Sequence, residues 1–415
     1  MTVTEASVRA EVRAWLEAHW DPELSLRDWR ERLADSGWGC PTWPEAWYGR
    51  GLPLAMESVV RQEFRRAGAV GIASGGGSGL AAPTILEHGS DELKRALLRP
   101  IITGEHAWCQ LFSEPGSGSD LAGLTTRADR DGDEFVISGQ KVWNTSAHHA
   151  QYGMLLARTN WDVPKHRGIS YFAFEMEQPG VTVRPLQQMN GYASFNEVFI
   201  NEARATLHQV IGQVDQGWSV ALATLAHERR LAGIHDDTPL EGSGRAIEEY
   251  REERAHVMAP YVWYPQRYGR VDLIVKRARE TGRDNDPVVR QEIAKLLSLQ
   301  RAAGWTAERA KQARVLGRPP GPEGSIGKLC GSHIARQAAD THALISESDA
   351  LLAGEDGPEA GIIAEILLSV PGQSIAGGTD EIQRNILAER QLGLPRDPTT
   401  DAGKPFRDVP RNVAD

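Results

Sequence analysis

Near its C-terminal end the chain reads Ser374-Ile375-Ala376-Gly377-Gly378-Thr379-Asp380-Glu381-Ile382-Gln383-Arg384-Asn385-Ile386-Leu387-Ala388-Glu389-Arg390. Gly377 and Gly378 permit a tight turn, and Thr379 belongs to the residue types that cap helix N-termini. Asp380 and Glu381 would then lie in the first turn, where the helix dipole favours acidic side chains. The segment therefore predicts a capped helix that begins directly after a glycine turn.

The predicted helix has one apolar face, an internal ion pair and a defined end. Its apolar stripe consists of Ile382, Ile386 and Leu387. Asp380 and Arg384 are spaced for an i,i+4 ion pair, and Gly393 followed by Pro395 ends the helix. The free N–H groups at its start suit a polar ligand, and beside two acids hydroxyl groups fit better than a phosphate. On these features alone, an ordinary structural helix is the commoner explanation.

A second ordered segment lies far earlier in the chain. It reads Trp108-Cys109-Gln110-Leu111-Phe112-Ser113-Glu114-Pro115-Gly116-Ser117-Gly118-Ser119-Asp120-Leu121-Ala122, and Asp131-Gly132-Asp133-Glu134-Phe135-Val136-Ile137-Ser138-Gly139-Gln140-Lys141-Val142-Trp143-Asn144-Thr145 follows. Residues 109–112 predict a short strand, residues 114–119 a turn, and Asp131-Gly132 a hairpin between two strands. On its own, such a turn is equally compatible with an ordinary loop.

The two segments together resemble the acyl-CoA dehydrogenase family. The order Gly-Gly-Thr-Asp-Glu-Ile-Gln-Arg resembles the family's C-terminal segment, which touches the flavin. Glu-Pro-Gly-x-Gly-Ser-Asp resembles its flavin- and thioester-binding turn, and Gly-x-Lys-x-Trp-x-Thr resembles the strand beside the isoalloxazine ring. The resemblance implies FAD as the cofactor, an acyl-CoA thioester as the substrate, and electron-transfer flavoprotein or another acceptor as the electron partner.

The hydrophobic pattern changes twice along the chain. Residues 1–105 have helical periodicity, residues 106–210 have strand-like alternation broken by Pro and Gly, and residues 211–415 are helical again. We expect further strands at 168–174, 181–186 and 195–201. This order is that of the acyl-CoA dehydrogenase fold, which is mostly α with a central β domain. The resemblance implies an N-terminal helical domain, a middle β-barrel-like domain and a C-terminal four-helix bundle.

Composition narrows the classes of function. A chain of 415 residues can bury a large core, and a formal charge of -10 disfavours nucleic acid or an anionic membrane as the main partner. No charged-then-apolar leader opens the chain, and its longest apolar stretch, Ile362–Val370, contains Glu365 and is too short to span a bilayer. We therefore expect a soluble, cytoplasmic protein.

The sequence offers little support for rival chemistries. The three cysteines are Cys40, Cys109 and Cys330. They lack metal-ligand spacing, so we expect reduced thiols. His148 and His149 would point to opposite faces of a strand, so no metal site is predicted. The run Gly75–Gly79 lacks the flanking pattern of a dinucleotide fingerprint, and we expect a flexible loop there.

The reaction that the resemblance implies needs a carboxylate base in a dry pocket, because the α-proton of the thioester is removed while the β-hydrogen leaves as hydride. Many family members carry that Glu at the position occupied here by Gly377. Others place it on the first long helix of the C-terminal domain, directly before an Arg, which matches Glu228 and Arg229. The helical neighbours of Glu228 are Thr224, Leu225, Leu231 and Ala232. This mostly apolar surround would raise its pKa, whereas the alternative is a solvated acid paired with nearby arginines.

The resemblance also assigns contacts to the flavin. Trp143 and Thr145 match the Trp and Thr beside the flavin ring, although a packed sheet tryptophan and an ordinary strand threonine would give the same pattern. Ser113 matches a contact to the pyrimidine end of the flavin, with Gln110 and Leu111 on the same strand.

Four further residues complete the predicted site. Thr379 and Glu381 match positions that meet the cofactor, often one bound largely by a neighbouring subunit. Ser119 matches a serine near the pantetheine or phosphate end of the thioester, and Arg229 matches an arginine that holds the site together. The resemblance therefore implies a homo- or hetero-oligomer, either a dimer or a tetramer.

Two segments depart from the family pattern. The hairpin motif that supplies an arginine to a neighbouring flavin pyrophosphate is not recognisable between Leu240 and Asp272, and the glycine-rich adenine-binding segment is weak at Leu351–Gly357. Three functions therefore stay open. FAD-dependent α,β-dehydrogenation of an acyl-CoA in fatty acid or lipid metabolism ranks first. A catalytically silent subunit of a heteromeric acyl-CoA dehydrogenase ranks second, and a flavin oxidase or monooxygenase of specialised metabolism ranks third.

Overall fold

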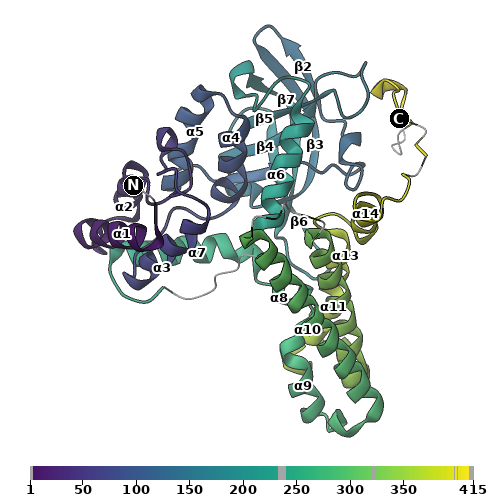
Figure 1. The fold of residues 1–415 in the computed structure, drawn as a ribbon. Coiled ribbons are helices and arrows are strands. Elements are labelled where there is room, and N and C mark those ends of the chain that lie inside the picture. The colour runs from purple at the N-terminus through teal and green to yellow at the C-terminus, as the bar shows by residue number, and fades with distance from the viewer. Residues whose placement is uncertain are drawn as a thin grey trace. The chain divides into compact units, whose positions relative to one another are not determined.

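The computed structural model describes residues 3–231, 240–316, 318, 321, 323–396, 398–399 and 401–410. The chain forms two compact units (Figure 1). The first comprises Met1–Leu186, Ala193–Pro260 and Asp401–Asp415, and the second comprises Gln187–Tyr192 and Tyr261–Thr400. The expected class, mostly α with a central β domain, is confirmed. The bounds of the three predicted domains stay a prediction.

The first unit opens with a layer of helices. They are α1 (Glu5–His19), α2 (Leu26–Ser36), α3 (Ala55–Arg66), α4 (Ala82–His88) and α5 (Asp91–Thr103). The Ser90 hydroxyl accepts from the backbone N–H of Leu93 and so caps the N-terminus of α5. Fully buried Trp29 of α2 anchors the layer, since its indole N–H donates to the Val70 carbonyl at 2.7 Å.

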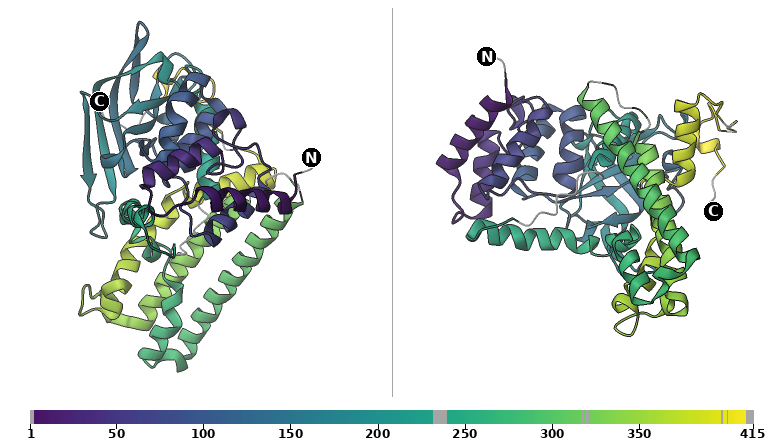
Figure 2. Two further views of the ribbon diagram at one scale, coloured as in Figure 1. Left: turned by 90° about the vertical axis from the view of Figure 1, so that its left-hand side faces the viewer. Right: turned by 60° about the horizontal axis from the view of Figure 1, so that its bottom comes forward.

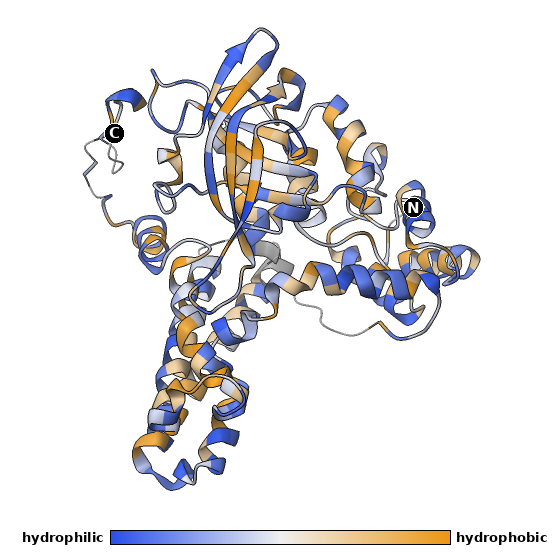
Figure 3. Cartoon of the chain, turned by 180° about the vertical axis from the view of Figure 1, so that it is seen from behind, coloured by the Kyte–Doolittle hydropathy of each residue, from blue (hydrophilic) through white to orange (hydrophobic). Residues whose placement is uncertain are grey.

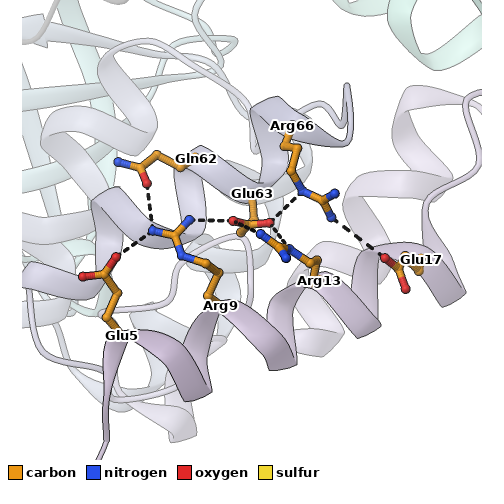
Figure 4. Close-up of polar contacts among 7 residues, drawn as sticks. All are labelled: Glu5, Arg9, Arg13, Glu17, Gln62, Glu63 and Arg66. Carbon is orange, nitrogen blue, oxygen red and sulfur yellow. Dashed lines mark hydrogen bonds and ion pairs between the residues drawn. The ribbon is translucent and has the colours of Figure 1, made fainter.

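A buried carboxylate joins α1 to α3. Glu63, only 1% exposed, accepts hydrogen bonds from Arg9 at 2.6 Å, Arg13 at 2.7 Å and Arg66 at 2.9 Å (Figure 4). The bonds from Arg13, with those from Arg9 and Arg66, outweigh burial and lower the pKa of the Glu63 carboxyl to about 2. Three cations converge on one acid, so its loss leaves them facing one another.

Acid should weaken this link within a defined pH range. The pKa of Glu63 is lower in the folded chain than the unfolded value of about 4.3, so its contribution to stability is complete above that value. It is lost as the pH falls toward 2. We expect Glu63→Gln to lower the melting temperature at pH 7 by several degrees and to flatten its decline between pH 4.3 and 2.

Thermal unfolding followed by circular dichroism at a series of pH values measures this effect. Glu17→Gln is the matched control, because Glu17 is 73% exposed and lies 3.9 Å from its partner Arg66. Identical melting curves for wild type and Glu63→Gln at pH 7 would contradict the assignment of Glu63 as the link.

The centre of the first unit is one mixed sheet. Its strands are β1 (Trp108–Leu111), β2 (Arg127–Asp131), β3 (Glu134–Thr145), β4 (Tyr152–Arg158), β5 (Ile169–Glu175), β6 (Val181–Leu186) and β7 (Phe195–Thr206). Their order is β1-β4-β2-β3-β7-β6, with β5 paired to β4. The hairpin expected at Asp131-Gly132 is confirmed, and Gly132 has a φ of +64°. The three further predicted strands are present, and the last continues to Thr206.

The two faces of the sheet pack into different hydrophobic clusters. Cys109 and Leu111 pack with Phe172 on one face, whereas Trp108 and Phe112 pack with residues of α4 and α5 on the other. The hydrophobic strands stand out in the middle of this unit in Figure 3. Because side chains alternate along a strand, Gln110 shares the helix-facing side with Trp108 and Phe112.

Two further helices belong to the first unit, α6 (Gly217–Leu231) and α7 (Arg245–Met258). Helix α6 packs on β5, on α4 and on a short π-helix, Gly77–Ala81. The prediction of a flexible loop at Gly75–Gly79 is therefore wrong for Gly77–Gly79, which lie in this π-helix. A Cβ added to Gly76 would lie 2.6 Å from the Trp108 carbonyl oxygen, so the glycines here permit close packing on β1.

The second unit is helical. It contains α8 (Tyr264–Arg267), α9 (Val271–Glu280), α10 (Pro287–Val315), α11 (Glu323–Ser346), α12 (Ile362–Ser369), α13 (Pro371–Ile375) and α14 (Asp380–Ile386). Helices α10 and α11 lie side by side as a long antiparallel pair (Figure 2). Their core includes Ile274, Leu296 and Ile345.

One segment of the second unit, Pro358–Gln391, is long and apolar enough to cross a membrane by length and composition, a test that core helices also pass. It is not a single rod. The segment is divided into α12, α13 and α14, and the φ values of Gly377 and Gly378 are +64° and +83°. These glycines form the turn that the sequence predicts before the last helix.

Candidate active site

Helix α6 carries the predicted base, and β1 supplies its neighbour. The side-chain amide of Gln110 donates to Oε2 of Glu228 at 3.4 Å. Both groups lie in the first unit and are partly buried. The structure therefore brings together two residues that the sequence assigned separately, one to the reaction and one to the cofactor.

Burial dominates the electrostatics of Glu228. It raises the pKa of the carboxyl above 4.5, while the hydrogen bond from Gln110 and the positive charge of Arg229 partly oppose the rise. Arg229 itself is exposed. A carboxylate with a raised pKa holds an abstracted proton more readily than a solvated one, which suits a general base.

Helix α6 is fixed one turn before Glu228. The buried hydroxyl of Thr224 lies 2.9 Å from that of Thr84 on α4 and 3.1 Å from that of Tyr171 on β5. In the next turn His227 lies 3.1 Å from a carboxylate oxygen of Glu87. The contacts of Thr224 are buried beside an apolar cluster that includes Tyr171, and together with His227 they fix the helix turn that carries Glu228.

Strand β3 presents Trp143 to solvent in an unusual way. The register with β7 shifts between Lys141 and Asn144, and Trp143 has a φ of +64°. Its side chain is 57% exposed and contacts Phe195 edge-on, with ring centroids 5.7 Å apart. A left-handed tryptophan at a bulge is strained, and such strain is concentrated at functional sites.

Three predicted cofactor residues lie near this bulge or on β1. They are Ser113, Thr145 and Leu111. The hydroxyl groups of Ser113 and Thr145 are partly buried and have no hydrogen-bond partner in the described part of the chain. Leu111 differs, because its side chain is fully buried on the opposite face of the sheet. Only the backbone of Leu111 is available to a ligand on the side of Gln110.

A buried ion pair between Lys141 and Glu114 supports these residues. The sequence alone did not identify it. Lys141 donates to Glu114 at 2.8 Å and to the Phe112 carbonyl at 3.1 Å. Burial would raise the pKa of Glu114, but Lys141 and the N–H groups of Thr125 and Thr126 lower it to about 2. A lysine at an inward position of an alternating strand is the sequence signal that identifies such a pair.

Ser119 lies in the exposed turn that follows Glu114. The turn is closed by Ser117, whose hydroxyl donates to the Asp120 carbonyl at 2.5 Å, and by Lys165, which pairs with the Asp120 carboxylate at 2.9 Å. The side chain of Ser119 therefore remains at the surface.

Thr379 and Glu381 lie in the second unit, at the start of α14. The Thr379 hydroxyl accepts from the Ile382 N–H at 3.2 Å, which confirms the predicted cap. The predicted pair of Asp380 with Arg384 is wrong. Asp380 is buried and pairs with Lys328 at 2.7 Å, whereas Arg384 pairs with exposed Glu381 at 3.3 Å. A buried acid selects the cation that reaches it inside the bundle.

His148 and His149 do not lie on a strand, so the expectation that a strand would turn them to opposite faces is wrong. They occupy a 3-10 turn, Ala147–His149, with ring centroids 3.9 Å apart. Within the described ranges no group of three or more His, Cys, Asp or Glu is arranged to hold a metal. Cys40 and Cys109 are buried free thiols, and burial raises the pKa of each.

Three sequence models of one family match this chain in order. They describe the N-terminal domain (residues 2–105), the middle domain (residues 109–203) and the C-terminal domain (residues 241–392) of acyl-CoA dehydrogenases. The chain belongs to the acyl-CoA dehydrogenase family. Acyl-CoA dehydrogenase IpdE1 of Mycobacterium tuberculosis is 34% identical over 94% of this chain and 97% of its own length.

Solved structures of the same family are similar over nearly the whole chain. The Tcur3481-Tcur3483 steroid ACAD has a TM-score of 0.65 and 25% identity, covering 95% of this chain and 98% of that one. The ChsE4-ChsE5 complex from Mycobacterium tuberculosis has a TM-score of 0.64 and 26% identity, covering 96% and 100%. The chain is thus an acyl-CoA dehydrogenase-type oxidoreductase, and related structures are two-protein complexes.

FAD is the cofactor of this acyl-CoA dehydrogenase. The residues of the first unit fit it. An exposed indole held at a bulge can stack on a flat ring, and the unpartnered hydroxyls of Ser113 and Thr145 can bond its polar edge. No other grouping of predicted residues in the described part of the first unit offers both features.

The buried ion pair generates a stability prediction. We expect Lys141→Met to lower the free energy of unfolding by about 3–5 kcal/mol, because the Glu114 carboxylate would stay buried without its cation. Lys276→Met, which removes a 57% exposed partner of Glu359, should leave stability nearly unchanged. Urea unfolding followed by tryptophan fluorescence compares them, and equal losses would contradict the role of the buried pair.

Proposed function

We propose that this chain catalyses the α,β-dehydrogenation of an acyl-CoA thioester, with Glu228 as the base that removes the α-proton. The observation that carries the proposal is the partly buried Glu228 carboxylate, with its raised pKa, fixed beside β1 by Gln110. Bound FAD supplies the acceptor for the β-hydrogen, which leaves as hydride. The protein's own task is to hold the base and exclude water from it.

The position used by many relatives is not available for a base here. Gly377 has a φ of +64°, which a glutamate would adopt only with strain. The acid on α6 lies in an ordinary helix, where its side chain costs no backbone strain. This contrast supports Glu228 as the base in this chain.

The remaining assignments belong to the same proposal. Trp143, Ser113 and Thr145 hold the flavin ring, with Gln110 and the Leu111 backbone beside it. Thr379 and Glu381, which belong to the second unit, meet a cofactor. Ser119 lies near the pantetheine or phosphate end of the thioester, and Arg229 stabilises the site. Electrons leave to electron-transfer flavoprotein or another acceptor, and the enzyme acts in cytoplasmic fatty acid or lipid metabolism.

Replacing the base tests the proposal directly. We expect Glu228→Gln to keep bound FAD but to slow thioester-dependent flavin reduction by roughly 10²- to 10⁴-fold, because the amide cannot accept the α-proton. Anaerobic bleaching of the flavin absorbance by straight-chain, branched and polycyclic acyl-CoA thioesters measures the rate. Glu202→Gln, at an exposed position of β7, is the control. Wild-type rates in Glu228→Gln would remove Glu228 as the base.

A second candidate function is that of one subunit in a heteromeric dehydrogenase. It is favoured by the similar two-protein structures and by Leu351–Gly357, which lacks the family's glycine-rich pattern. In that case the purified chain alone should carry well under one FAD per chain and gain FAD with a partner. Flavin absorbance combined with light scattering measures both, and stoichiometric FAD with turnover would exclude this candidate.

A further inference from the structure

The side chain of Gln110 has a specific orientation. It lies on the side of β1 that faces the helices, between Trp108 and Phe112, and its amide nitrogen reaches Oε2 of Glu228 at 3.4 Å. The described residues offer no hydrogen bond to the second carboxylate oxygen of Glu228. One oxygen is therefore held and the other is left to react.

The backbone of Gln110 is itself held by two buried amides. The Asn144 side chain donates to the Gln110 carbonyl at 2.7 Å, and the Asn196 side chain donates to the Asn144 carbonyl at 2.8 Å. Asn144 and Asn196 are 1% and 0% exposed. This chain of bonds runs from β7 through β3 to β1, so the amide of Gln110 is carried by the rigid sheet rather than by a loop.

We propose that Gln110 is a positioning residue that holds the Glu228 carboxylate for proton abstraction, rather than a side-chain ligand of the flavin. This inference rests on the proposed function. The role differs from the cofactor contact that family resemblance implies, because the side-chain amide is committed to Glu228 and the carbonyl to Asn144.

The charged and titratable groups around Glu228 leave Gln110 as its main polar partner. Among the described side chains of α6 and of the elements packed against it, these groups are Glu87, His88, Tyr171, Glu175, His227 and Arg229. Glu87 pairs with His227, and the Tyr171 hydroxyl bonds Thr224. Glu175 accepts from Gln209. The π-helix Gly77–Ala81 has no titratable side chain, and Arg229 acts on Glu228 through its charge.

Loss of this hydrogen bond has a predictable sign. An N–H that donates to a carboxylate favours the charged form, so its removal raises the pKa of the acid. We expect Gln110→Leu to shift the Glu228 titration upward by about one pH unit and to lower the rate of flavin reduction roughly tenfold at neutral pH. The effect should fall on kcat more than on KM, because substrate contacts are unchanged.

Infrared difference spectroscopy of the FAD-loaded enzyme, titrated with acid and base, measures the protonation of Glu228 without any substrate. The carboxyl band that disappears in Glu228→Gln assigns the signal. Gln140→Leu is the matched control, since Gln140 on β3 donates to Glu197 rather than to α6. Gln110→Asn keeps the amide on a shorter side chain and should shift the titration by less than Gln110→Leu.

The outcomes separate this inference from the function on which it rests. An upward shift in Gln110→Leu with none in Gln140→Leu supports the positioning role. An unchanged midpoint in a Gln110→Leu protein that binds FAD normally overturns it, as does a shift in Gln110→Asn as large as that in Gln110→Leu. If the shift occurs but no acyl-CoA thioester bleaches the wild-type flavin, the contact stands and the dehydrogenase function fails.

Discussion

The Lys141–Glu114 ion pair is the constraint on which the first unit's site depends. It joins the middle of β3 to the turn that follows β1, and both side chains are almost completely buried. On one side of the pair the backbone continues into the bulge of Trp143, and on the other it continues into Ser113. Isolated in an apolar interior, either charge would be costly, so the two segments are held in a single register. The candidate cofactor residues Trp143 and Ser113 are therefore placed by a buried charge pair between the two segments.

The position of Glu228, the proposed base, follows from a second, different constraint. Helix α6 is held by Thr224 against both α4 and β5, and the bonded hydroxyl groups lie within a hydrophobic cluster. Glu228 lies one turn further along, at the edge of that cluster, where it is neither fully dry nor fully solvated. Burial in this environment raises the pKa of the Glu228 carboxyl. The raised pKa of Glu228 is therefore a consequence of where helix α6 is placed.

Local features of the fold could be predicted from the sequence, whereas long-range pairs could not. The Thr379 cap and the Asp131-Gly132 hairpin depend on neighbours within a few residues, and both are confirmed. The partner of Asp380 is Lys328 on another helix, and the partner of Glu228 is Gln110 on a strand. Such partners depend on which elements meet in three dimensions, and periodicity does not contain that information. Family resemblance supplied the residues of the site, but not the contacts between them.

The glycine before the π-helix sets how closely β1 approaches the helix layer. A Cβ at Gly76 would lie 2.6 Å from the Trp108 carbonyl, on the strand that carries Gln110 two residues later. Any side chain at this position would push β1 away from the helix layer. A substitution at Gly76 would therefore also move the strand whose Gln110 side chain is bonded to Glu228. A change confined to the helix layer can in this way alter a hydrogen bond that none of its own atoms makes.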